Sequence, residues 1–139
     1  MSLEERLVRL GHDLVERESQ HKDSLAAARA DASRLHGCVS SALERFNATV
    51  RSRAPQLMVS VSDPRIDDKH LHAVQFELAR GRHRAIITVK SRGEVTLVGP
   101  FRTGKTEGPC HSLPIDAETE IQAALGDFLA EFIEAAASP

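Results

Sequence analysis

One short stretch in the second half of the chain carries the strongest chemical signature in the sequence. Residues 99–106 read Gly-Pro-Phe-Arg-Thr-Gly-Lys-Thr, which fits the phosphate-binding pattern GxxxxGK followed by Ser or Thr. The stretch directly follows a predicted strand, as the pattern requires. It therefore makes Gly104, Lys105 and Thr106 candidates for contact with an anion.

Taken by itself, the stretch resembles the Walker A loop of P-loop nucleotidases. The resemblance implies that Lys105 reaches terminal phosphates and that the Thr106 hydroxyl holds magnesium. That family places its loop at the amino end of a helix, but a glycine and two prolines between residues 108 and 114 interrupt any helix here. A phosphate-ligand or nucleotide binder or enzyme that uses Gly99–Thr106 is therefore the alternative function. A loop that turns a corner is the simpler interpretation of the stretch.

Charge is distributed unevenly along a chain whose net charge is only −2. Residues 79–105 hold seven basic residues and one acidic residue, a local charge of +6, whereas residues 106–139 hold seven acidic residues and no Lys or Arg. A basic hairpin can attract an anion or an acidic partner. The candidate contacts are Arg80, Arg82, Arg84, Lys90, Arg92, Arg102, Gly104, Lys105 and Thr106.

Other patterns exclude several classes of function. The five aromatic residues are all Phe, so a base-stacking surface is not expected and nucleic acid is not an expected partner. The pairs His70 with His72 and Cys110 with His111 are too sparse to define a metal centre or a nucleophile. We therefore expect no catalytic residue, no metal and no cofactor.

The two cysteines and the distribution of apolar residues bear on location. Cys38 and Cys110 lie far apart and outside any CxxC motif, so both are expected to be free thiols. No apolar stretch is long enough to span a membrane, and the amino end lacks the apolar region of a signal peptide. These features favour a cytoplasmic protein that does not enter the membrane.

Residues 1–54 contain no proline and are rich in helix formers, which predicts a long N-terminal helix or a helical hairpin. Apolar residues recur at steps of three and four, but a step of 11 residues separates Leu14 from Leu25. The helix either continues through this step or breaks near Ser19–Asp23. A continuous helix cannot be covered by its own small domain, which favours pairing with a second copy. The predicted association seam consists of Leu7, Leu10, Leu14, Leu25, Leu35, Val39 and Phe46.

Residues 55–139 predict a four-stranded antiparallel meander and a terminal helix. Alternation places strands near residues 57–61, 73–80, 83–90 and 94–101, with turns at Gly81 and Gly93. The resulting register pairs Phe76 with Ile87 and Ile87 with Leu97. After an irregular segment, an amphipathic helix begins with Asp116 as its N-cap and packs on the apolar face of the sheet. The fold class is α+β.

Together these patterns divide the chain into a helical arm or hairpin at 1–54, which is the expected association element, and a compact unit at 55–139. The two parts are expected to form one structural unit. We favour a small, non-enzymatic cytoplasmic protein that forms a homodimer through its N-terminal helix. It would bind a protein partner in an adaptor, chaperone-like or regulatory role.

Overall fold

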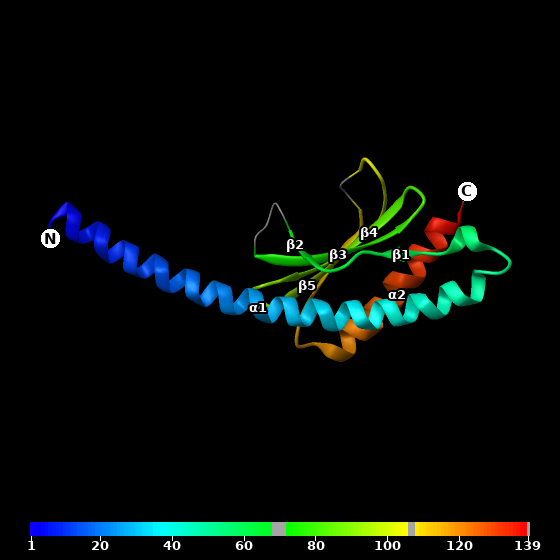
Figure 1. Ribbon diagram of the computed structural model, residues 1–139, viewed down its shortest axis with the longest axis horizontal. Coiled ribbons are helices and arrows are strands. Elements are labelled where there is room, and N and C mark those ends of the chain that lie inside the picture. Colours follow the sequence, from blue (N-terminus) through cyan, green and yellow to red (C-terminus); the bar gives the residue numbers. More distant parts are fainter. Residues whose placement is uncertain (68–71, 106–107, 139) are drawn as a thin grey trace.

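The chain folds into a sheet that carries two helices on one face, and one of these helices extends far beyond the sheet (Figure 1). The computed structural model describes residues 1–67, 72–105 and 108–138. The elements are α1 (Leu3–Val50), a short 3-10 helix (Pro55–Leu57), β1 (Ser60–Val61), β2 (Arg65–Ile66), β3 (Ala73–Arg80), β4 (His83–Lys90), β5 (Glu94–Arg102), β6 (Cys110–Pro114) and α2 (Glu118–Ala137). The strand order is β1-β3-β4-β5-β6, and β2 also pairs with β3. The predicted α+β class is confirmed.

Helix α1 is continuous over 48 residues, so the chain has a single long helix and not a helical hairpin. The Ser2 hydroxyl caps it by accepting a hydrogen bond from the Glu5 amide at 3.1 Å. The polar run Glu16–Ser24 does not break the helix, because Glu, Arg, Gln and Lys are good helix formers. The helix ends before Pro55, which restricts the backbone of the residue that precedes it.

The central three strands have the register that the sequence predicts. Phe76 lies opposite Ile87, and Ile87 lies opposite Leu97. The turns fall at Gly81, with φ of 58°, and at Gly93, with φ of 89°. Residues other than glycine are strained at such positive φ values, which is why these two glycines fix both hairpins and their register.

Three details of the structure predicted for residues 55–139 are wrong. The strand expected at 57–61 is reduced to β1, because Pro55 starts a 3-10 turn that includes Leu57. Two strands, β2 and β6, form in addition to the four that the sequence predicts. Helix α2 begins at Glu118 with Ala117 at its N-cap, so Asp116 does not cap it.

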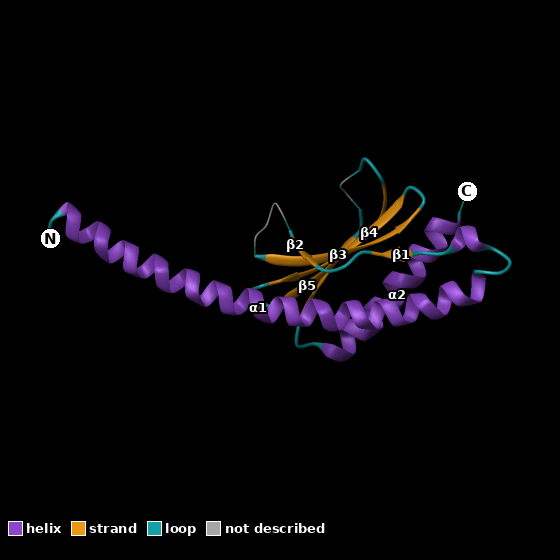
Figure 2. Ribbon diagram, viewed as in Figure 1, coloured by secondary structure: helices purple, strands orange, loops and turns teal. Residues whose placement is uncertain are grey.

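The core lies between the helices and one face of the sheet (Figure 2). The second half of α1 packs on β3 and β4, and α2 packs on β4 and β5. Asn47 fastens the carboxyl end of α1 to the chain that leads into β1: its side-chain amide donates to the Val59 carbonyl at 2.9 Å, and its carbonyl accepts from the Val59 amide at 2.8 Å. The most deeply buried large side chains include Phe76, Phe132 and Leu35.

Candidate functional site

The first 20 residues of the chain form an arm that projects away from the sheet as the free end of α1 (Figure 1). Every one of these 20 residues is exposed. They include four leucines, here called the leucine seam: Leu3, Leu7, Leu10 and Leu14. A row of exposed leucines on a projecting helix is an apolar surface without a partner in the described chain.

The leucine seam lies on the same side of α1 as the residues that pack on the sheet. The 11 residues from Leu14 to Leu25 are close to three full turns at 3.6 residues per turn, so the apolar stripe continues through the polar run. Val8 and Val15 are also exposed, but each lies one residue beyond a seam leucine and therefore about 100° around the helix. The sheet-packing face of α1 thus extends past the end of the sheet.

Charged residues lie on both sides of the leucine seam. With Leu7 and Leu14 at heptad position a and Leu3 and Leu10 at d, Arg6 and Asp13 occupy position g on one side. Glu4, Gly11 and Glu18 occupy position e on the other side. A helix pair formed along the seam would bring these flanking charges together, so their signs affect the orientation of the pair.

A pair of histidines marks the point where the arm leaves the body of the protein. His21 of α1 and His72, just before β3, are in contact, with ring centroids 3.7 Å apart and ring planes tilted by 47°. Their Nδ1 atoms lie 2.8 Å apart, so one ring donates a hydrogen bond to the other. This contact ties α1 to the start of β3 and helps to fix the direction of the arm.

The predicted association seam divides into two parts in the structure. Leu35 and Val39 are buried in the core of their own chain, and Leu25 and Phe46 are partly buried against it. Leu7, Leu10 and Leu14 remain exposed. The division arises because the sheet covers only the second half of α1, so the free seam is limited to the arm.

The phosphate-binding pattern does not lie in the setting that the Walker A resemblance implies. Its first four residues, from Gly99 to Arg102, belong to β5, and Gly104 follows in a turn with φ of 96°. Thr106 lies outside the described residues. After the turn, the described chain forms strand β6 and not a helix. A helix amino end that could hold phosphate therefore does not follow the pattern in the described chain.

The candidate basic residues do not form one cluster. Lys90 and Arg92 lie at one end of β4, whereas the other candidates lie near its opposite end, roughly 25 Å away for a strand of this length. At that opposite end the Arg80 guanidinium donates to the Ala136 carbonyl at 2.6 Å, and Arg84 pairs with Glu77 at 3.1 Å. The basic residues that are exposed at this end are Arg82, Arg102 and Lys105.

Glu94 offsets part of the positive charge at the other end. Its carboxylate accepts from Arg92 at 3.2 Å and from Lys90 at 3.3 Å. These hydrogen bonds, chiefly the one from Arg92, hold the pKa of Glu94 below its ordinary value. Both cations are thus engaged within the chain, which weakens the prediction that they contact an anion or a partner.

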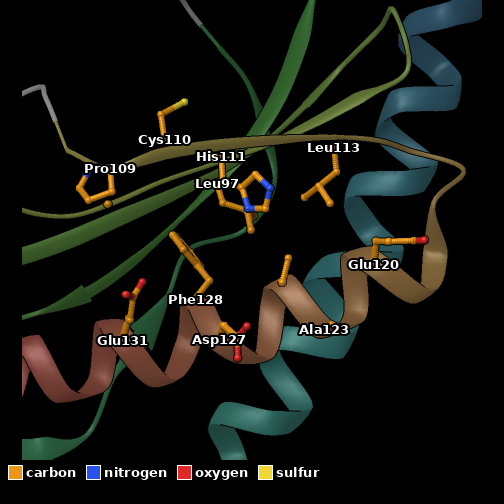
Figure 3. A pocket seen from close by; sticks show the side chains of 12 residues that line it. Leu97, Pro109, Cys110, His111, Leu113, Glu120, Ala123, Asp127, Phe128 and Glu131 are labelled. Atoms are coloured by element: carbon orange, nitrogen blue, oxygen red, sulfur yellow. The ribbon is translucent and has the colours of Figure 1, made fainter.

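A groove that the sequence did not suggest lies between β6 and α2 (Figure 3). It has a volume of about 520 Å³. Leu97, Leu113 and Phe128 form its apolar floor, and Glu120, Asp127 and Glu131 of α2 line its rim. The spacing of the three acidic residues predicts that they share one face of α2. Nothing in the sequence indicates that a strand lies opposite this face.

No group of three or more His, Cys, Asp or Glu side chains that could hold a metal ion occurs in residues 1–67, 72–105 and 108–138. His70 lies outside the described residues. Within the described chain, no helix has both the length and the apolar character needed to cross a membrane. Comparison with protein-family models, curated protein sequences and solved structures gives no match.

Proposed function

We propose that the protein is a small, non-enzymatic cytoplasmic homodimer whose arms pair through the leucine seam, and that it serves as an adaptor or regulatory protein for a protein partner. The observation that carries the proposal is the row of exposed leucines on a helix that projects past its sheet. Two exposed cysteines without a disulfide fit a reducing compartment.

The two arms pair in antiparallel orientation. With a and d positions opposed, as in antiparallel coiled coils, one register places every seam leucine against another: Leu3 opposite Leu14 of the second copy, and Leu7 opposite Leu10. In this register Arg6 of each chain lies next to Asp13 of the other. A parallel pair would instead place Asp13 near Glu18 of the second copy, which is a repulsive contact.

The position of the sheet also favours the antiparallel pair. The seam lies on the sheet-packing face of α1, so a parallel partner that followed the seam would meet the sheet near Leu25. An antiparallel partner begins beside Leu14 and runs away from the sheet. The antiparallel pair therefore fits on the exposed arm, and neither helix has to bend around the sheet.

The length of the seam sets the strength of the dimer. Four leucines per chain form a small interface, below the range of about 1,200 Å² at which stable complexes begin. The arm is already helical because it continues a helix that is anchored in the core, so pairing does not have to nucleate it. We therefore expect a dissociation constant in the micromolar range, which corresponds to a free energy of association on the order of −8 kcal/mol.

Cysteine cross-linking tests both the pairing and its orientation. In a background with Cys38→Ser and Cys110→Ser, one protein carries Leu3→Cys and another carries Leu14→Cys. We expect a mixture of the two to form an intermolecular disulfide at least about tenfold faster than either protein alone. In the antiparallel pair these positions are opposed, whereas two copies of position 3 lie about 17 Å apart along the axis.

The matched control uses Val8→Cys and Val15→Cys in the same background, because these positions are exposed but lie off the seam. Their mixture should react no faster than each protein alone. Rapid disulfide formation by Leu3→Cys alone would show a parallel pair. Equal rates in all samples would contradict pairing through the seam.

A further inference from the structure

The groove between β6 and α2, here called the β6 groove, lies at the edge of the sheet. Helix α1 packs mainly on β3 and β4, and α2 packs mainly on β4 and β5, so the helix side of β6 is covered only in part: Leu113 is partly buried and His111 is exposed. Strand β6 is the last in the strand order. His111 and Leu113 point from it toward α2 (Figure 3). The groove thus has a strand edge on one side and a helix on the other.

Within the described chain, no strand pairs with the outward edge of β6. The Gly99 amide donates to the Pro109 carbonyl at 2.8 Å, and the Ile115 amide donates to the Gly93 carbonyl at 2.9 Å. Hydrogen-bonded pairs alternate along an antiparallel ladder, so His111 and Leu113 direct their backbone groups to β5.

Cys110 and Ser112 consequently direct their N–H and C=O groups outward, and both residues are exposed. Pro114 has no N–H and ends this edge. In the described chain the edge can pair with about five residues of another strand.

The rim of the groove is acidic and uncompensated. Glu120, Asp127 and Glu131 line it, and none of the three belongs to an ion pair in the part of the chain that the structure describes. The chain has no Lys or Arg after Lys105. A partner with basic side chains would relieve the repulsion among these carboxylates, and its charge would speed association.

We propose that the β6 groove binds an extended segment of a protein partner in which apolar and basic side chains alternate with small polar ones. The segment joins the sheet as an additional strand beside β6. Its apolar side chains contact Leu97, Leu113 and Phe128, and its Lys or Arg side chains pair with the carboxylates of α2. A helical partner would satisfy its own backbone and leave the edge of β6 unpaired, so a strand is the occupant that uses both features.

Fluorescence anisotropy with synthetic peptides tests the proposal on the full chain. The probe is a fluorescein-labelled peptide of sequence Lys-Thr-Leu-Thr-Lys-Thr-Leu. A second peptide has Glu in place of Lys. A third peptide is N-methylated in two versions: one at its three Thr residues, and the other at the Lys and Leu residues that alternate with them. We expect saturable micromolar binding of the first peptide. The Glu peptide should bind at least about tenfold more weakly, as should one of the two methylated versions, which lacks the N–H groups that face β6.

Two variants at Ser112 isolate the backbone hydrogen bond. Ser112→Pro removes the outward N–H, and Ser112→Ala keeps it; both lose the contact between the Ser112 and Thr96 hydroxyls at 3.1 Å. Proline is tolerated at an edge position whose N–H faces solvent. We expect Ser112→Ala to bind like the native chain and Ser112→Pro to bind about tenfold more weakly. Equal affinities of the two variants would overturn strand addition.

A charge-reversed pair tests the rim. Asp127→Lys with Glu131→Lys should weaken binding of the Lys peptide about tenfold or more. The control is Glu16→Lys with Glu44→Lys, which makes the same change in net charge at exposed positions of α1 outside the groove. This control should bind within about threefold of the native chain.

Thermal melting checks that each variant is folded, and the methylated peptides test the backbone contacts without changing the protein. Absence of saturable binding by the native chain up to about 1 mM, or equal binding of the Glu peptide, would refute the proposal.

Discussion

Replacing Leu7 and Leu10 together by glutamine is expected to convert the dimer into a monomer. These leucines form the two central layers of the antiparallel seam, and each dimer loses four of them. Their exposed fractions in the single chain are 58% and 47%, so pairing removes a substantial apolar area at each position. Loss of about 1 kcal/mol per side chain weakens the dimer at least about 100-fold. Sedimentation equilibrium over a range of protein concentrations measures the change.

The control for this experiment is Val8→Gln with Val15→Gln. These valines are as exposed as the leucines, at 61% and 70%, but lie on another side of α1. The control should keep the native dissociation constant. Leucine and glutamine have similar helix propensities, so circular dichroism should show an unchanged helix in the leucine variant. If the valine pair dissociates the dimer as strongly as the leucine pair, the leucine seam is not the interface.

The Phe132→Ala variant is expected to lower the free energy of unfolding by about 3–5 kcal/mol. Phe132 lies on α2 and is completely buried in the core that α1, α2 and the sheet share. Alanine at this position leaves a cavity that the surrounding side chains fill only in part. A domain of this size has about 5–15 kcal/mol of stability in total, so the melting temperature should fall by about 10 °C or more. Urea denaturation followed by circular dichroism measures the loss.

Phe46→Ala provides the comparison, because Phe46 packs at the border of the same core and is only partly buried. It should cost about half as much as Phe132→Ala, since less apolar surface is exposed and little cavity forms. Both variants should still pair through the arm wherever they are folded, because neither residue belongs to the leucine seam. Equal losses of stability in the two variants would mean that Phe132 does not fill the centre of the core.

The sequence predicts the centre of the sheet well because that part depends on local signals. Alternating apolar residues and a glycine at each turn specify β3, β4 and β5 and their register. The sequence did not predict strand β6, because it has two exposed polar residues, His111 and Ser112, and prolines at its ends, and so lacks an apolar alternation. Its pairing comes from the free edge of β5, which is a tertiary contact that no local pattern records.

The path of the N-terminal helix could be predicted only in part. Helix propensity indicated a long helix, but it left open whether the chain folded back, continued or broke in the polar run. Leu35 and Val39 do not belong to the exposed leucine seam because the sheet covers this part of α1, and the sequence does not show where the sheet ends along the helix. A periodic pattern looks the same whether its partner is a sheet of the same chain or a second helix.

The candidate contacts of the basic hairpin show the limit of reading charge along the chain. The net charge of +6 over residues 79–105 suggested one attractive surface, but folding separates the basic residues to two ends of β4. The engagement of Lys90 and Arg92 with Glu94 follows from a tight turn and cross-strand register. Of the seven acidic residues in 106–139, in contrast, five lie on α2, and three of these five line a groove.

Small-angle X-ray scattering of the unmodified chain, on an absolute intensity scale and above micromolar concentration, tests the central claim most directly. The antiparallel dimer predicts a mass of 2 × 15.2 = 30.4 kDa. It also predicts a maximum dimension of about 125 Å, because two helices of 48 residues overlap only along their arms. A mass of 15.2 kDa at every concentration would contradict self-association. A dimer no longer than one α1 helix, about 72 Å, would contradict the antiparallel arrangement.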